Sequence, residues 1–180
     1  MLTTDQHRLR AMEMADVQTV QRWENESDDW WMGARILPVS IEAMTQYAKG
    51  NHDLYLDRQL RWMLDAYDES EGSWVSAGAI DLYDFDPRQL RAGVAIHIDE
   101  AHRRKGHARA GLSLLGRYAS NHLGLKQLYA EVPSNHEASL RLFAEVGFEA
   151  TGKREQWIRT PQGAWTDVVT LQLFFNSSIA

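Results

Sequence analysis

Apolar side chains recur along this chain with two periods, and the period separates the expected helices from the expected strands. Val17, Val20 and Trp23 return every three residues and predict a helix that begins at Asp16. Runs rich in apolar residues and bounded by Gly, Asn, Asp or Pro predict strands. The expected strands are 8–12, 59–67, 74–83, 91–98, 128–132, 148–158 and 168–174. The other expected helices are 40–49, 106–122 and 135–146.

The order of these elements, β-α-α-β-β-β-α-β-α-β-β, predicts one α/β domain over residues 1–180. A helix separates the strand that ends at Ile98 from the strand that begins near Leu128. Such a crossover returns the chain to the same edge, so these two strands should be parallel neighbours. The strands 59–67 and 74–83 are separated by a turn-like segment and should form an antiparallel hairpin, so the sheet as a whole should be mixed.

Composition narrows the class of protein. The chain is 44% apolar and 24% charged, as in ordinary soluble proteins. No apolar run approaches the ~20 residues of a membrane helix, and the first ten residues lack the apolar centre of a signal peptide. We therefore expect a cytoplasmic protein without a membrane partner. Cysteine is absent, which excludes thiolate catalysis and disulfides.

Charge is distributed unevenly between the two halves of the chain. The net charge of −6 argues against a nucleic-acid partner. Residues 1–100 hold 9 Lys and Arg against 19 Asp and Glu, whereas residues 101–180 hold 10 against 6. The first half would attract a cation and the second would tolerate an anion. Chance clustering of solvated charges is the alternative interpretation.

A candidate anion site lies between the strand at 91–98 and the helix at 106–122. The segment Arg103-x-x-Gly106-x-Ala108 places a Gly at a helix start, where unpaired N–H groups and the helix dipole favour an anion. Arg103, Arg104 and Lys105 would add charge-assisted donors. The alternative is a generic basic helix start. The strand before and the helix after the segment favour a site for a diphosphate.

Two sequence blocks resemble the GCN5-related N-acetyltransferases (GNAT). Their Gln/Arg-x-x-Gly-x-Gly/Ala signature is matched at Arg103, Gly106 and Ala108, and a strand–Asn–helix–Gly-Phe block is matched from Leu128 to Phe148. The resemblance covers about residues 8–175. It is greatest to spermidine acetyltransferases and to ribosomal-protein N-terminal acetyltransferases. It implies a sheet of about seven strands, splayed at the central parallel pair and flanked by about four helices.

The resemblance also implies a donor site for acetyl-CoA. Pantetheine would pair with backbone groups of the first splayed strand, and the pyrophosphate would lie on the loop. Asn135 would hold the pantetheine arm, and Phe143 would lie near the thioester sulfur. The implied donor-site residues are Ile96, His97, Ile98, Arg103, Arg104, Lys105, Gly106, His107, Ala108, Asn135 and Phe143.

Acetyl transfer to an amine needs a proton acceptor, because a free primary amine is mostly protonated at neutral pH. The resemblance implies Glu131 as the base, and a cross-strand ion pair is its alternative role. Many relatives place a Tyr, which protonates the departing thiolate, where Phe143 stands. Here water, Tyr129 or Tyr83 would serve instead, or the thiolate would leave unprotonated, since a thiol pKa near 8.5 permits this.

Acidic residues of the first half are candidates for the acceptor side. Asp81, Asp84 and Asp86 would recognise a cation, with Asp81 as an alternative base, or would form a solvated turn before Pro87. A second group would line the acceptor mouth, or would form a polar loop anchored by its Trp residues. This group is Glu24, Glu26, Asp28, Asp29, Trp30 and Trp31.

These observations predict an acetyl-CoA-dependent N-acetyltransferase with a primary amine as acceptor, a polyamine or another small cationic amine being favoured. A protein N-terminus is the alternative acceptor, and a catalytically silent CoA-binding module is the alternative function. The seven histidines show no ligand spacing, so we expect no metal. The Trp-rich composition is compatible with a homo-oligomer.

Overall fold

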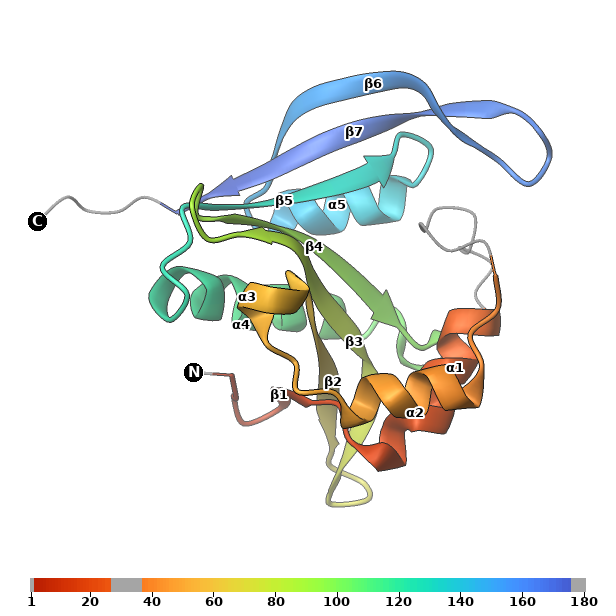
Figure 1. Ribbon diagram of the computed structural model, residues 1–180, viewed down its shortest axis with the longest axis vertical. Helices are drawn as coiled ribbons and strands as arrows, with labels where there is room; N and C mark the ends of the chain where they lie inside the picture. Colours follow the sequence, from red (N-terminus) through yellow and green to blue (C-terminus); the bar gives the residue numbers. More distant parts are fainter. Residues whose placement is uncertain (1, 27–36, 176–180) are drawn as a thin grey trace, which may run out of the picture.

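The computed structural model describes residues 2–26 and 37–175 (Figure 1). Seven strands form one mixed sheet in the order β1-β2-β3-β4-β5-β7-β6. Only β4 and β5 run parallel among the described strands, as the sequence predicts. The strands are β1 (His7–Ala11), β2 (Leu60–Asp68), β3 (Ser73–Asp86), β4 (Arg91–Ile98), β5 (Gln127–Pro133), β6 (Glu149–Arg159) and β7 (Trp165–Phe174).

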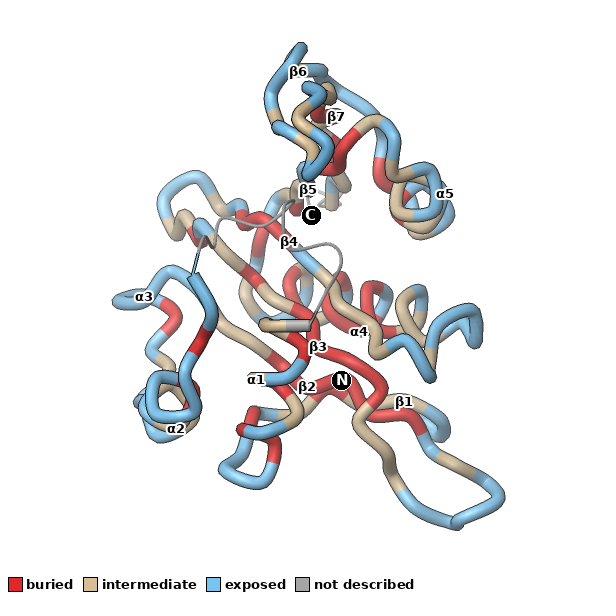
Figure 2. The backbone as a smooth tube through the Cα atoms, turned by 90° about the vertical axis from the view of Figure 1, so that its right-hand side faces the viewer, coloured by how far each residue is buried: buried red, intermediate tan, exposed pale blue. Residues whose placement is uncertain are grey.

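Helices cover both faces of this sheet. Figure 2 shows α4 on one side of β2–β4 and α1 and α2 on the other. The described helices are α1 (Val17–Glu26), α2 (Ile41–Lys49), α3 (Leu54–Asp57), α4 (His107–Asn121) and α5 (Glu137–Glu145), with the 3-10 turns η1 (Met14–Asp16) and η3 (Glu100–His102). Four of the α-helices match the expectation. The short α3 was not expected, and Asp53 caps it by accepting hydrogen bonds from the N–H groups of Tyr55 and Leu56.

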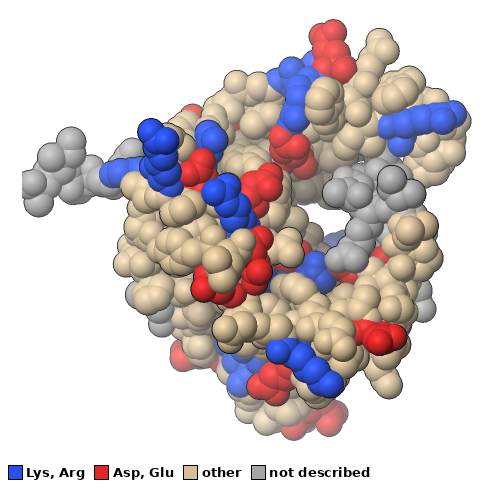
Figure 3. All heavy atoms as spheres, in the orientation of Figure 1, with Lys and Arg blue, Asp and Glu red and all other residues tan. Residues whose placement is uncertain are grey.

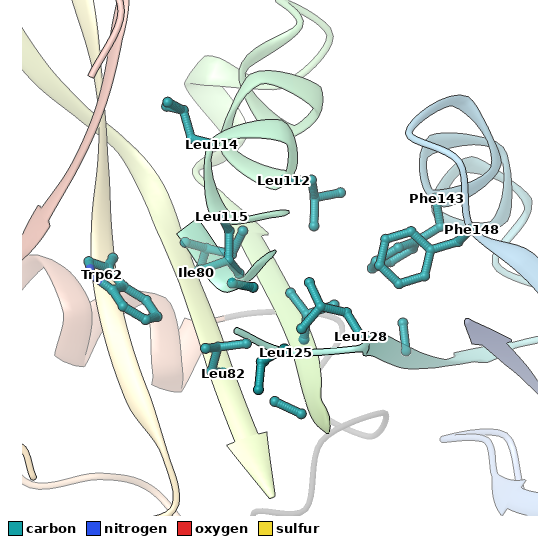
Figure 4. Packing of buried hydrophobic residues seen from close by; sticks show 14 of the residues in the cluster. Trp62, Ile80, Leu82, Leu112, Leu114, Leu115, Leu125, Leu128, Phe143 and Phe148 are labelled. Carbon is teal, nitrogen blue, oxygen red and sulfur yellow. The ribbon is translucent and has the colours of Figure 1, made fainter. Parts of the chain in front are cut away.

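The core is divided by the sheet into two clusters. The larger lies between the sheet and α4 and α5, where Leu112, Leu115 and Leu128 point toward one another beside Phe143 and Phe148 (Figure 4). The smaller cluster joins α1 and α2 to the opposite face of β2 and β3. Each fully buried Leu, Ile or Phe contributes about 1.5–3 kcal/mol by leaving water. Because successive side chains of a strand point to opposite faces, each strand between the two clusters can contribute to both.

The parallel pair β4–β5 is joined over only a short length. Its register covers Arg91↔Gln127, Ala92↔Leu128 and Gly93↔Tyr129, although β4 continues to Ile98. Beyond that point β4 keeps its pairing with β3, and β5 keeps its pairing with β7. The two halves of the sheet therefore diverge after Gly93 and Tyr129, which confirms the predicted splay. We call this divergence the fork.

Several predicted boundaries were wrong by one to three residues, and at three of them the structure shows the local cause. The first long helix begins at Val17 rather than Asp16, because the buried Asp16 carboxylate accepts bonds from Arg10 and from the N–H of Glu13. The helix after β5 begins at Glu137 rather than at residue 135, with His136 as its cap.

The third boundary lies in β3, which continues past residue 83 to Asp86 through a register shift. Asp84 takes a φ of 49° within this shift, so one residue there departs from the ladder while pairing resumes at Asp86↔Arg91. An irregularity of this kind re-aims the side chains around it. It lies beside the closed end of the fork.

Candidate active site

The start of α4 has the geometry that an anion requires. Gly106 is the N-cap residue with φ 82° and ψ −2°, and no side chain caps the helix there. A Cβ added to Gly106 would meet nothing within 4 Å, so the space in front of the turn is open. Arg104 also takes a positive φ of 62°. Two left-handed residues so close together turn the backbone sharply into the helix, and strain of this kind is typical of functional loops.

Backbone N–H groups at this turn are available to a ligand. The first intrahelical bond runs from the Ala110 N–H to the Gly106 carbonyl, 3.1 Å. The N–H groups that precede Ala110 in the helix therefore have no carbonyl of an earlier helical turn to bind. Together with the helix dipole they suit a diphosphate.

The loop's side chains have different tasks. Arg103 Nε donates to the Ile98 carbonyl at 3.2 Å, which ties the loop to the end of β4. His107 Nδ1 and His7 Nε2 of β1 share a hydrogen bond of 2.9 Å, and burial lowers the pKa of His107, so its imidazole is neutral at pH 7. Arg104 and Lys105 are exposed. They are the cations that face solvent beside the open turn.

The part of β4 beyond the fork connects this loop to the point where the strands part. Five residue steps separate Gly93 from Ile98, about 17 Å of strand. Over this length β4 has no strand partner on its β5 side within the described chain. An extended ligand could therefore pair with its backbone, as expected for Ile96, His97 and Ile98. Figure 3 shows a hollow between the part that carries β5–β7 and the part that carries β2–β4.

The α5 side of the fork carries two other predicted donor-site residues. Phe143 is 3% exposed and packs edge-to-face on Phe148, with ring centroids 5.0 Å apart. It is therefore a residue of the main hydrophobic core. Asn135 is exposed in the turn between β5 and α5.

The predicted base Glu131 lies on β5, two residues past the end of the β4–β5 pairing. Its carboxylate forms an ion pair with Arg154 of β6, across the intervening β7. Both side chains keep contact with solvent, 38% exposed for Glu131 and 35% for Arg154. The structure thus contains the ion pair named as the alternative role. To act as a base, the Glu131 carboxylate would have to accept a proton while it is paired with Arg154.

The hydroxyls at the fork belong to Tyr83 and Tyr129, whose rings meet edge-to-face with centroids 5.7 Å apart. Tyr129 donates its hydroxyl to Asp84 Oδ2 at 3.0 Å. Burial, and then the Asp84 carboxylate, raise the pKa of Tyr129 to about 12. Burial, followed by Tyr129 and Asp84, also raises the pKa of Tyr83. Both phenols therefore keep their protons at neutral pH.

A cavity of ≈ 290 Å³ opens beside the fork on the α2 side of the sheet. Its floor contains Arg61, which donates to both oxygens of Asp81 at 2.7 Å and to Glu24 Oε1 at 2.6 Å. The lining residues are Val39, Ala43, Met44, Tyr47, Gln59, Leu60, Arg61, Asp81, Leu82, Tyr83 and Ala95. The walls are thus mainly apolar and aromatic around the ion pair of Arg61 and Asp81.

The sequence interpretation did not find Arg61. Burial alone would lower the pKa of this guanidinium, but the Asp81 and Glu24 carboxylates outweigh burial and raise it, so Arg61 stays charged. The only signal in the sequence was a charged residue within an apolar run, Leu60-Arg61-Trp62-Met63. Nothing in that run indicates its two partners, which come from α1 and β3.

Family comparison decides the class of this fold. The family model described as an acetyltransferase (GNAT) domain matches residues 7–149. The chain belongs to the GNAT acetyltransferase family.

Individual relatives agree with this assignment. An uncharacterized N-acetyltransferase, YoaA of Bacillus subtilis (strain 168), is 28% identical over 120 residues, and the match spans 66% of each chain. The spermidine N-acetyltransferase of Vibrio cholerae in complex with CoA and spermine has a TM-score of 0.78 at 22% identity, over 95% of this chain and 96% of that one. A dodecameric structure of the same Vibrio cholerae enzyme has a TM-score of 0.76 at 22% identity, over 95% of each chain.

The protein is thus a GNAT enzyme, and the expected fold and family are confirmed. Its three acidic residues near the end of β3 do not form one cluster. Asp81 binds Arg61, Asp84 accepts from Tyr129, and Asp86 accepts from the N–H groups of Arg88 and Gln89 in the turn that follows. For Asp86 this is the turn role named as the alternative.

One carboxylate that the sequence did not single out joins the two sides of this GNAT site. Asp99, directly after β4, accepts from Arg22 at 2.7 Å and from the Trp23 indole at 2.6 Å, both on α1. It also accepts from the Ala101 N–H at the start of the donor loop. Burial would raise its pKa, but these bonds lower the pKa of Asp99 to about 2. The carboxylate therefore stays charged and holds α1 against the loop.

Other predictions fall outside this geometry. Asp28, Asp29, Trp30 and Trp31 lie outside the described residues, and Glu24 belongs to the Arg61 group. Within residues 2–26 and 37–175, no group of three or more His, Asp and Glu side chains could hold a metal ion. No helix in the same two ranges is long and apolar enough to cross a membrane.

Proposed function

We propose that this GNAT enzyme transfers the acetyl group of acetyl-CoA directly to a primary amine, and that the acceptor is a polyamine or another small cationic amine. The observation that supports the donor most is the alignment of two backbone features. The uncapped start of α4 lies at the open end of the fork, and the unpaired edge of β4 leads from it to Gly93. An anionic group on an extended arm would use both.

The donor site rests mainly on main-chain groups. Gly106 with its positive φ and open surroundings would let a pyrophosphate approach the helix N–H groups, and Arg104 and Lys105 would add charge. The edge of β4 at residues 96–98 would orient the pantetheine arm. Acetyl-CoA, when bound, supplies a thioester that an amine can attack without a covalent enzyme intermediate.

The chain's own residues would then help to remove the one proton that the amine loses. The N–C bond forms as the C–S bond breaks, and the amine nitrogen loses a proton to a base or to solvent. Glu131 is the proposed base, because it lies two residues beyond the closed end of the fork and is in contact with solvent. Asp81 is the alternative, although both its oxygens accept from Arg61. Tyr129 would remain protonated beside them.

Charge in the cavity supports a cationic acceptor. The cavity is lined by the carboxylate of Asp81, which Arg61 holds in place, beside apolar and aromatic walls. Such walls suit the methylene chain of an amine, and a carboxylate oxygen can accept from its ammonium group. The Vibrio cholerae structure with CoA and spermine supports the same class of acceptor.

We also propose that the chain forms a homo-oligomer. Trp157 and Trp165 at the β6–β7 hairpin are 54% and 59% exposed, which is unusual for side chains of this size. The dodecameric Vibrio cholerae enzyme supports this proposal. Light scattering on the purified chain should give a mass above the 20.6 kDa of one copy.

The main experiment measures thiol release from acetyl-CoA with a panel of acceptors: spermidine, spermine, a diamine, simple amino acids and a peptide with a free N-terminus. We expect release with polyamines and diamines. Release only with the peptide would move the acceptor to a protein N-terminus. Binding of acetyl-CoA without release for any acceptor would contradict the proposed activity and favour a CoA-binding module.

A further inference from the structure

The ring of Tyr83 packs closely against Gly93, the last residue of β4 that pairs with β5. The two residues are direct cross-strand partners in the β3–β4 register. A Cβ added to Gly93 would lie 2.3 Å from Cε2 and 2.4 Å from Cζ of Tyr83, closer than real atoms approach. The outer end of the ring, which carries the hydroxyl, therefore lies directly over Gly93. Only glycine permits this.

This position places the Tyr83 hydroxyl at the closed end of the fork. Gly93 pairs with Tyr129 at the point where β4 and β5 part. Tyr83 also lines the cavity of ≈ 290 Å³, together with Asp81 and Ala95. The same ring thus borders the end of the proposed donor path and the proposed acceptor site. A reacting thioester must lie where these two sites meet.

Tyr83 and Tyr129 differ in what their hydroxyls bind. Tyr129 donates its proton to Asp84 Oδ2, 3.0 Å away, so this hydroxyl already has an acceptor. The Tyr83 hydroxyl has no hydrogen-bond partner among residues 2–26 and 37–175. Burial raises the pKa of Tyr83, so the hydroxyl keeps its proton at neutral pH. Among the described residues it is therefore a donor without an acceptor.

We propose that the Tyr83 hydroxyl donates a hydrogen bond to the negative charge that develops on the thioester during acetyl transfer, and that Gly93 exists to admit its ring. The inference rests on the proposed function. The N–C bond forms, the C–S bond breaks and CoA leaves as its thiolate with the electron pair, while the phenol proton stays on Tyr83. The amine proton leaves by the base or solvent, so the hydroxyl returns unchanged after each turnover. A donor that acts only on developing charge raises kcat without tightening substrate binding.

The test compares two substitutions that each remove one hydroxyl from neighbouring rings. Tyr83→Phe should lower kcat about 100-fold, the usual effect of removing one such donor, with the Kd of acetyl-CoA changed less than twofold. Tyr129→Phe, the matched control, should lower kcat far less, because its hydroxyl is bound to Asp84. Equal losses for the two variants, or a kcat for Tyr83→Phe within twofold of wild type, would overturn the inference.

A second variant tests the position of the ring. Gly93→Ala forces the Tyr83 ring to move, so it should lower kcat in the wild-type background but add little in the Tyr83→Phe background. Thermal unfolding of each variant with and without acetyl-CoA separates loss of fold from loss of turnover. Additive losses would contradict the inference. Wild-type turnover is measured first, so that failure of the proposed function and failure of the Tyr83 role give different results.

Discussion

The proposed donor side and the proposed acceptor side of this enzyme are built on different principles. The donor side comes from one continuous stretch, from Arg91 at the start of β4 to Phe148 after α5, and it offers mainly backbone groups. The acceptor side gathers side chains from separate elements: Glu24 of α1, Arg61 of β2 and Asp81 of β3. The first is fixed by local conformation, and the second exists only when the elements have packed.

This difference explains why the sequence predicts the loop at Gly106, whereas the ion group around Arg61 appears only in the structure. A turn that needs Gly106 and a helix that follows it leave a pattern in neighbouring letters. The ion group around Arg61 joins side chains from one helix and two strands, and it leaves no such pattern in the sequence. It also predicts that substitutions on the two sides separate: those at the loop should change donor binding, and those at the cavity should change the amine.

The largest expected effect is at the place where the two sides meet. Glu131→Gln should lower kcat by about 100-fold or more, as expected for removal of a general base, and should change the Kd of acetyl-CoA much less. Steady-state kinetics and calorimetric titration measure the two quantities. The matched control is Arg154→Gln, which breaks the same ion pair from the other side. If both variants lose the same activity, or neither loses any, Glu131 serves the ion pair and not the proton.

A change in the loop should act on the donor alone. Gly106→Val should weaken acetyl-CoA binding about 100-fold or more, and calorimetric titration should show it. The physical reason is the φ of 82°, which a β-branched residue resists, and not a clash, since nothing lies within 4 Å of the added Cβ.

Gly124 provides the control for Gly106. It also has a positive φ, 65°, with nothing within 4 Å of an added Cβ, and it lies in the turn between α4 and β5. Gly124→Val should therefore cost similar stability while leaving acetyl-CoA binding near wild type. Equal loss of binding in both variants would assign the effect to general strain, and the donor loop would lose its main support.

A change at the cavity should act on the amine. Arg61→Met leaves Glu24 and Asp81 without their common partner, so the KM for the amine should change at least about 10-fold while the Kd of acetyl-CoA stays constant. Breaking a buried ion pair from one side also lowers the free energy of unfolding by about 3 kcal/mol. Arg8→Met is the control, because Asp65 keeps its bond to Arg10. A shift in donor affinity instead would contradict the division into two sides.

The smallest expected effect concerns Asp99, which joins the two sides. Its folded-state pKa of about 2 lies below the ordinary 3.8, so its contribution to stability is complete above about pH 4 and is lost as the pH falls toward 2. Asp99→Asn should lower the free energy of unfolding at pH 7 by about 1–2 kcal/mol and flatten the decline below pH 4. Urea unfolding between pH 7 and pH 2.5 measures both. An unchanged acid slope would show that another group carries it.

Much of the fold was readable from local patterns. Apolar runs bounded by turn residues predicted all seven strands, and apolar positions at helical spacing predicted the four longer helices. Boundaries failed where a side chain with a distant partner intervened. Asp16 lies outside its predicted helix because its carboxylate binds Arg10. Strand β3 continues past residue 83 through a bulge that no residue type in the sequence predicts.

By itself the sequence determined the order of the elements, the parallel pair and the loop at Gly106, since each depends on neighbouring residues and on chain direction. The tertiary structure decided which charges meet. It paired Glu131 with Arg154, enclosed Arg61 between Glu24 and Asp81, and set the Tyr83 ring on Gly93. These contacts join residues far apart in the chain, and their geometry is fixed only when the sheet and its helices have packed.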